Sequence, residues 1–313
     1  MDGGIAMRFP GRRISLIIVS VLLVVFWGNS AFGVSDSYFL NARDGLLVIK
    51  GVLPAPSGHG GIGGLEKMLG NADIDFGKIV ILKILPSAAP GEEGSPYDTL
   101  GTPGFLTTED VVFIADNFHG LREFDAGGTK AAKGSFIPSG VGRKMRELEI
   151  VILPDDIEAL ADSAFEDAGH LELLVLSDGL KEIGENALNT GTNRGEFSNG
   201  LTIEFMDTEP PEAIDPKAFG SMVDAAADDK GELHVTIPPE IYFPADNEGY
   251  SSVLMPALLT AGLDAWEADN LLMRGQLLDR DGSTGVDLEG VLALLMVFVL
   301  AVGVVYVILK TTV

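Results

Sequence analysis

The sequence predicts a mainly β solenoid of short parallel strands joined by irregular returns, with a helical C-terminal cap and a C-terminal transmembrane helix. An apolar pattern recurs after 23 residues, a segment of helical character follows it, and a long run almost without charge lies near the C-terminus. The chain has 313 residues and a formal net charge of −25, yet its mean hydropathy is +0.28. Acidic proteins seldom average so apolar, so the charged and apolar residues must lie in different segments.

The N-terminal segment 1–33 has the layout of a secretory signal peptide. Three arginines precede the apolar run 14–27, and small residues at Ala31 and Gly33 supply a cleavage pattern. We expect cleavage after Gly33, because an apolar run of about 14 residues barely spans a bilayer. The alternative is an uncleaved N-terminal anchor.

Near the other end, the run 288–309 predicts a transmembrane helix. It contains one charged residue, Glu289, and corresponds to about 33 Å of helix, which is roughly the thickness of a bilayer core. The positive-inside rule places Lys310 and the tail 310–313 in the cytoplasm, together with the N-terminal arginines. The segment 34–287, which holds 44 of the 46 acidic residues, would then lie outside the membrane.

Composition excludes several classes of site. The chain has no cysteine, so it can form neither disulfides nor thiolate metal sites. The large excess of acidic residues makes nucleic acid a poor partner, because phosphate binding depends on Lys and Arg. An exported domain without cysteine is typical of a bacterial cell surface or envelope.

Internal repetition is the main signal within the exported segment. Residues 148–165 and 171–188 align without a gap, and their apolar positions recur 23 residues apart. A third copy follows at 201–219, and 233–237 predicts a fourth strand. A period in the low twenties, with a short β-like run and then a turn, is typical of a leucine-rich-repeat solenoid. One such unit cannot bury its apolar face alone, so the units are expected to stack.

The repeated motif resembles a known family. Leu-x-x-Val-x-Leu-Pro-x-x-Ile-x-x-Leu-x-x-x-Ala-Phe at 148–165, repeated in related form at 171–188, is similar to the BspA-type leucine-rich repeat of bacterial surface proteins. Pro210-Pro211 ahead of Ala218-Phe219 resembles the terminal repeat of that family, whose usual cysteine is absent here. The resemblance covers 148–245. It implies surface exposure and, in several members, adhesion to host proteins or other cells, without naming a ligand.

Upstream, the segment 34–147 is interpreted as diverged repeats. The β-branched runs 46–49, 78–82 and 111–114 predict strands. Insertions rich in Gly and Pro would separate them, at 58–64, 86–103 and 127–142.

Downstream, the segment 246–287 is expected to contain a helical cap and a polar linker. A helix is predicted over 255–279. Its candidate buried positions are Leu258, Leu259, Leu263, Trp266 and Leu271.

Motifs for chemistry are scarce. Residues 58–63 match G-x-G-x-x-G by letter, but prolines separate them from the preceding strand, so a glycine-rich loop is expected. Residues 279–289 are similar to a calcium loop, yet leucines stand where its first and last carboxylates are required. Incidental Ca²⁺ contact at Asp279–Asp287 stays open. The four histidines show no metal-ligand spacing, so we expect no catalytic residue, no cofactor and no metal site.

The exposed face of the strands is the predicted binding surface. Glu149 and Glu172 occupy equivalent positions, which would favour a basic or cation-bridged partner. We expect a membrane-anchored cell-surface module that binds an extracellular protein or glycan and is not an enzyme. The alternative is a structural envelope protein without a specific ligand. The candidate ligand-binding residues are Glu149, Ile150, Ile152, Glu172, Leu173, Val175, Thr202 and Glu204.

Overall fold

The computed structural model describes residues 32–34, 37–50, 52–57, 61–85, 104–191, 200–221, 238–244 and 248–276, which belong to one compact unit, 31–279. The predicted span 288–309 and tail 310–313, and all but the last two residues of the predicted signal peptide, lie outside the described residues. Within the described part of the chain, no helix has the length and apolar character needed to cross a membrane.

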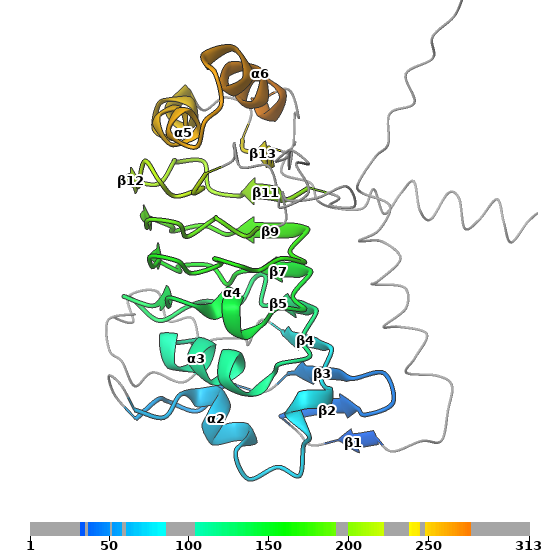
Figure 1. Ribbon diagram of the computed structural model, residues 1–313. Helices are drawn as coiled ribbons and strands as arrows, with labels where there is room; N and C mark the ends of the chain where they lie inside the picture. Colours follow the sequence, from blue (N-terminus) through cyan, green and yellow to red (C-terminus); the bar gives the residue numbers. More distant parts are fainter. Residues whose placement is uncertain are drawn as a thin grey trace, which may run out of the picture. The chain divides into compact units, whose positions relative to one another are not determined.

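The principal element is a sheet in which nine strands of the described chain stack one above another (Figure 1). Its first two pairings, β1 with β2 and β2 with β3, are antiparallel, and every later pairing is parallel. The expectation of short parallel strands is therefore confirmed. In order across the sheet, the strands are β1 (Phe32–Val34), β2 (Tyr38–Asn41), β3 (Leu46–Ile49), β4 (Ile81–Ile84), β5 (Glu123–Asp125), β7 (Ile150–Ile152), β9 (Leu173–Leu176), β11 (Thr202–Phe205) and β13 (Glu240–Tyr242).

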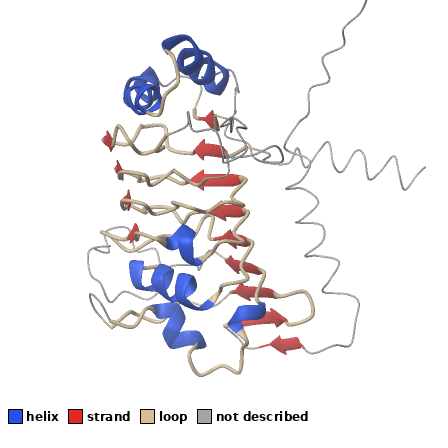
Figure 2. Cartoon of the chain, viewed as in Figure 1, coloured by secondary structure: helices blue, strands red, loops and turns tan. Residues whose placement is uncertain are grey.

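A second sheet of two-residue strands faces the principal sheet (Figure 2). The chain alternates between the two sheets from β5 to β12, so each repeat contributes one strand to each sheet. All pairings in the second sheet are parallel. Its strands are β6 (Phe136–Ile137), β8 (Ala159–Leu160), β10 (Glu182–Ile183) and β12 (Ala213–Ile214).

The repeat aligned in the sequence is the register of the strands. Val151 pairs with Leu174, 23 residues later, and Leu174 pairs with Ile203 of the third copy. These three side chains point inward and are at most 1% exposed. The turns repeat as well, because Ser163 and Asn186 are both left-handed, with φ of 58° and 55°. The predicted strand 233–237 lies outside the described residues, and the next strand in the stack is β13.

Residues 111–114, assigned above to a strand, lie in helix α3 (Thr108–Asn117), so that assignment is wrong. Thr107 and Asp110 form a capping box, in which each side chain accepts a hydrogen bond from the other residue's backbone N–H. A helical period outweighs the β-branched composition, because the apolar residues spaced three and four apart are all at most 3% exposed. These residues are Val111, Ile114, Ala115 and Phe118.

Two other predictions in this region need correction. The strand expected at 78–82 starts later, as β4, because the 3₁₀ helix η1 (Phe76–Lys78) occupies the preceding residues. The segment 127–142 is not a plain insertion, since it contains β6 and the start of helix α4 (Val141–Lys144). The third strand of the upstream region is β5, which carries Phe124 in its centre.

Glycines at the start of helix α2 (Gly64–Leu69) allow a close approach to other parts of the chain. A Cβ atom on Gly63 would lie 2.2 Å from Asp110 Oδ1, and one on Gly64 would lie 2.4 Å from the carbonyl oxygen of Pro54. Asp110 Oδ1 also accepts a hydrogen bond of 2.7 Å from the backbone N–H of Leu65. These two glycines therefore serve helix packing, and a carboxylate of the chain itself already occupies the helix start.

The helix predicted over 255–279 is two helices, α5 (Glu248–Thr260) and α6 (Ala265–Gln276). Gly262, with φ of 106°, reverses the chain between them. The break rotates the second half relative to the expected pattern, so part of the predicted buried set is wrong. Leu258 and Leu263 are buried and Leu271 is partly buried, whereas Leu259 and Trp266 are 43% and 75% exposed.

Tyr250 fixes α5 to the end of β11. Its ring is fully buried and stacks on Phe243 at a centroid distance of 5.0 Å. Its hydroxyl donates to the carbonyl oxygens of Asp207 and Glu209, at 3.0 and 3.1 Å. Burial, together with neighbouring acidic residues, raises the pKa of this hydroxyl. Helix α6 lies against β13, where a Cβ on Gly275 would be 2.4 Å from the carbonyl oxygen of Ile241.

Candidate functional site

The predicted binding residues lie along one face of the principal sheet, the face turned away from the second sheet, which we call the outer face. Side chains alternate along each strand, so that Val151, Leu174 and Ile203 point into the core and their neighbours point outward. Six of the eight predicted residues lie on the outer face in two rows. One row is Ile150, Leu173 and Thr202, and the other is Ile152, Val175 and Glu204.

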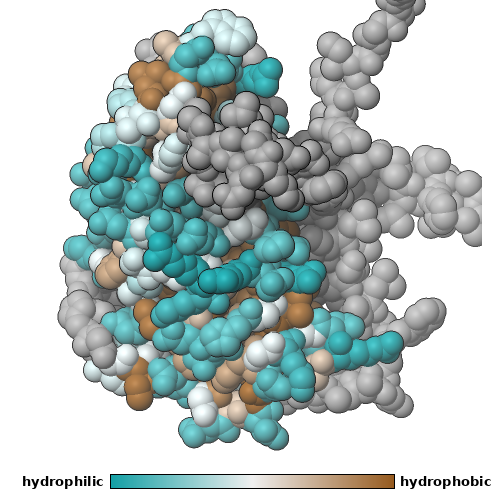
Figure 3. Space-filling view, in the orientation of Figure 1, coloured by the Kyte–Doolittle hydropathy of each residue, from teal (hydrophilic) through white to brown (hydrophobic). Residues whose placement is uncertain are grey.

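Four aliphatic side chains form the centre of the outer face, and we call them the aliphatic patch: Ile150, Ile152, Leu173 and Val175. Ile150 lies opposite Leu173 and Ile152 lies opposite Val175, on adjacent strands. Three of them are partly exposed, while Val175, at 9%, is more covered than expected. Polar residues dominate the surface visible in Figure 3, so a group of four aliphatic residues on a sheet face is distinctive.

A charged cluster borders the aliphatic patch on the β5 side. Lys83 Nζ lies 2.8 Å from Glu123 Oε1 and 3.1 Å from Asp125 Oδ2. Their side chains are only 15%, 12% and 26% exposed. Burial alone would lower the pKa of Lys83, but the hydrogen bonds and negative charges of the two carboxylates outweigh it and raise that pKa. Sequence reasoning missed this cluster, because the two strands that carry it had been misplaced.

The opposite border of the patch is also polar. Thr202 pairs with Glu240 and Glu204 pairs with Tyr242, at the last strand of the sheet. The Tyr242 hydroxyl donates to Glu240 Oε2 at 2.9 Å. The outer face thus has an aliphatic centre between two polar borders.

Glu149 and Glu172 lie immediately before β7 and β9 rather than in them. They are in register as expected, because the N–H of Glu172 donates to the carbonyl oxygen of Glu149 at 2.8 Å. However, Glu149 Oε1 lies 3.4 Å from Arg122 Nη1, and both side chains are about half exposed. This arginine partly offsets the acidic charge that was expected to attract a basic partner.

Carboxylates also form a column at the turns that follow three successive strands. Asp155, Asp178 and Asp207 occupy equivalent positions after β7, β9 and β11. Burial and neighbouring acidic residues raise the pKa of Asp155 and that of Asp178. In the described ranges, no group of three or more His, Asp or Glu side chains is arranged to hold a metal ion. The segment Asp279–Asp287, where calcium contact was considered, is almost entirely outside those ranges.

Comparison with known proteins adds no assignment. Neither a protein-family model, nor a curated protein, nor a solved structure matches this chain. The argument for function therefore rests on the residues of the outer face.

Proposed function

We propose that this chain is a membrane-anchored leucine-rich-repeat solenoid of the cell surface that binds an extracellular protein through its outer face. The 23-residue register and the two parallel sheets support the repeat assignment. The apolar run 288–309 supports the anchor. The proposal describes a binding module without catalytic function.

The aliphatic patch carries the proposal of a protein ligand. Protein interfaces commonly place an apolar centre inside a polar rim, and the apolar centre supplies most of the binding energy. The outer face has this arrangement, with Lys83, Glu123 and Asp125 on one border and Thr202 and Glu204 on the other. Stacking on aromatic rings, by contrast, has little place at four aliphatic side chains, so a glycan fits this face less well.

The test is binding of the purified full chain to a panel of defined extracellular proteins and glycans. For a protein that binds, Ile150→Glu combined with Leu173→Glu should weaken affinity at least tenfold, about 1.4 kcal/mol, because charges replace the apolar centre. Phe136→Glu is the matched control, since Phe136 is 39% exposed on a strand of the second sheet. Ile150→Thr, which keeps the β-branched shape, separates lost binding from lost folding.

Two further results would count against the proposal. Equal binding by the wild type and the Ile150→Glu/Leu173→Glu variant would exclude the outer face as the binding surface. If no protein or glycan in the panel binds, the alternative of a structural envelope protein is favoured. Glu149→Lys together with Glu172→Lys measures the contribution of the acidic pair, which we expect to be small because Arg122 already offsets part of its charge.

The anchor is tested separately. The full chain should stay with the membrane fraction after alkaline extraction, and deletion of 288–309 should release it. Sequencing of the mature N-terminus distinguishes cleavage after Gly33 from an uncleaved anchor. Cleavage there would leave only Val34 of β1, whose residues pair with β2.

A further inference from the structure

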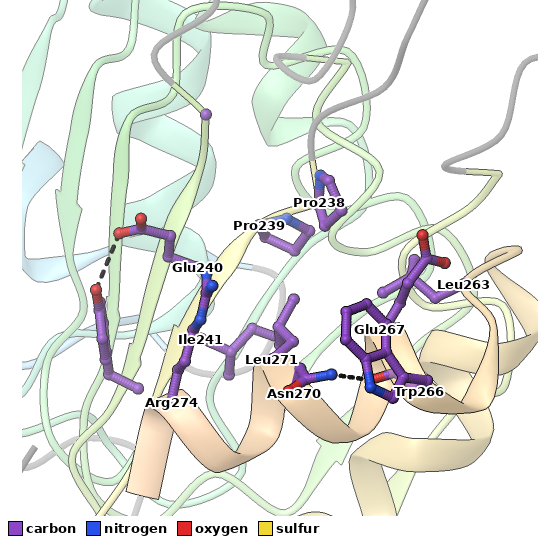
Figure 4. A pocket seen from close by; sticks show the side chains of 12 residues that line it. Pro238, Pro239, Glu240, Ile241, Leu263, Trp266, Glu267, Asn270, Leu271 and Arg274 are labelled. Atoms are coloured by element: carbon purple, nitrogen blue, oxygen red, sulfur yellow. Dashed lines mark hydrogen bonds between the residues drawn. The ribbon is translucent and has the colours of Figure 1, made fainter. Parts of the chain in front are cut away.

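A cavity of about 550 Å³ lies between strand β13 and helix α6, at the end of the outer face (Figure 4). Its volume falls within the range of about 300–1,000 Å³ that is typical of small-molecule sites. Ile241 and Leu271 form apolar parts of its wall, and Pro238 and Pro239 close it on the side of β13. Polar groups from the helix and the strand surround this apolar wall.

Trp266 is the most exposed large apolar residue of the described chain, at 75%. It borders the cavity from the first turn of α6. The buried face of this helix is made by Ala268 and Leu272, so the indole is not needed for packing. An exposed indole beside a cavity offers a flat apolar surface on which a ring can stack.

Trp266, Asn270 and Arg274 are spaced four residues apart, so they lie along one stripe of α6 that borders the cavity. From the first to the last of them, the helix rises by about 12 Å, which is the length of about two linked pyranose rings. The Arg274 guanidinium makes no hydrogen bond or ion pair with any described residue, and it carries five donors. Figure 4 shows Arg274 and Trp266 at opposite ends of the cavity, with Leu271 between them.

Acceptors face the same space. Glu240 receives one hydrogen bond from Tyr242 at a single oxygen, Oε2, which leaves Oε1 for another donor. Glu267 likewise uses only Oε2, for the backbone N–H of Asp264. Asn270 donates its amide to the carbonyl oxygen of Trp266, so its side-chain oxygen remains an acceptor. The cavity thus presents carboxylate and amide acceptors together with a guanidinium donor.

We propose that this cavity binds a short neutral oligosaccharide, with one sugar ring stacked on Trp266 and hydroxyl groups bonded to Glu240, Asn270 and Arg274. Sugar hydroxyls donate and accept at once, which matches carboxylate, amide and guanidinium groups in one site. The C–H face of a pyranose is apolar and fits the indole. Two carboxylates against one guanidinium disfavour an anionic ligand. The site is separate from the aliphatic patch, so it does not depend on protein binding there.

The test is a titration of the purified full chain on an array of neutral gluco-, galacto-, manno- and N-acetylglucosamine oligosaccharides. We expect binding that falls at least tenfold in Trp266→Ala and in Arg274→Ala. Met273→Ala is the matched control, since Met273 lies on the same helix, is 54% exposed and does not line the cavity. Thermal unfolding should be unchanged in Trp266→Ala, because exposed side chains contribute little to stability.

Three results would overturn the proposal: no binding to any neutral oligosaccharide, binding that survives Trp266→Ala, or a preference for anionic glycans or peptides. Ile150→Glu/Leu173→Glu should keep full oligosaccharide binding. That variant distinguishes failure of this site from failure of the proposed protein-binding face.

Discussion

The side chain of Asp110 and the backbone of Leu65, 45 residues apart, are joined by a hydrogen bond of 2.7 Å that connects the starts of two helices. Asp110 is fully buried, and its second oxygen accepts from the N–H and the hydroxyl of Thr107, both at 3.0 Å. One carboxylate therefore satisfies donors at the beginning of α2 and of α3. Burial raises the pKa of Asp110, and these hydrogen bonds oppose that rise.

Asp110→Ala should lower the free energy of unfolding by about 2–4 kcal/mol, because it leaves three buried donors without an acceptor. The measurement is chemical denaturation at pH 7. Asp116→Asn is the control on the same helix, since its ion pair with Lys144 is half exposed and is worth about 0–1 kcal/mol. Equal losses in the two variants would contradict the role given to Asp110.

Gly184→Ala should destabilise the protein by about 1–3 kcal/mol, because the new Cβ would lie 2.4 Å from Asp162 Oδ1 and 2.7 Å from Asp162 N. The equivalent position in the preceding repeat is Ala161, and there the residue in place of Asp162 is Ser139. Asp162→Ser should therefore remove part of the cost. A double-mutant cycle by thermal unfolding tests this, and strict additivity of the two changes would refute the proposed contact.

Lys83→Met should cost about 1–4 kcal/mol, because it leaves Glu123 and Asp125 largely buried without their shared cation. Lys217→Met is the matched control, since Lys217 and Glu185 are 65% and 45% exposed and contribute less than about 1 kcal/mol. The folded-state pKa of Lys83 is raised, so its contribution is fully present below about 10.4, the unfolded value, and is lost only as the pH rises through the folded pKa. Denaturation at pH 7 and pH 9 should give the same difference from wild type.

Asp178→Asn should raise stability at pH 7, by about 1 kcal/mol or less, because burial and the charges of Asp207 and Asp156 raise the pKa of Asp178. An acid whose folded pKa lies above its unfolded value of about 3.9 destabilises the fold once it ionises. The gain should thus be complete above the folded pKa and vanish below about pH 4. Thermal unfolding between pH 4 and pH 7 measures it, and added salt should reduce it.

The repeats were the part of the fold that the sequence could predict. Apolar residues spaced by 23, such as Val151 and Leu174, report the strand register directly, because each repeat buries the same side chains. In the upstream region the same reasoning failed at Val111 and Ile114. There a short β-branched run belongs to a helix whose cap, Thr107 with Asp110, is a local signal that could have identified it.

The candidate site was predictable only where alternation decides it. Ile150, Leu173 and Thr202 point outward as expected, because their neighbours along each strand fill the core. The pairing of Lys83 with Glu123 was not predictable, since 40 residues separate them and only the sheet register brings them together. The exposure of Trp266 depends on the break at Gly262, which shifts the helix face by a turn geometry that the apolar pattern does not encode.

The close approach of Gly275 to Ile241 also limits how the molecule can grow. Helix α6 covers the last strand, and the antiparallel hairpin of β2 and β3 begins the parallel array, so both ends are committed to dedicated residues. Duplication of a 23-residue unit between them would lengthen the array by about 4.8 Å while leaving both ends intact. Evolution can thus adjust the length of such a chain in whole-repeat steps, and we expect natural variants to differ in repeat number rather than in their terminal elements.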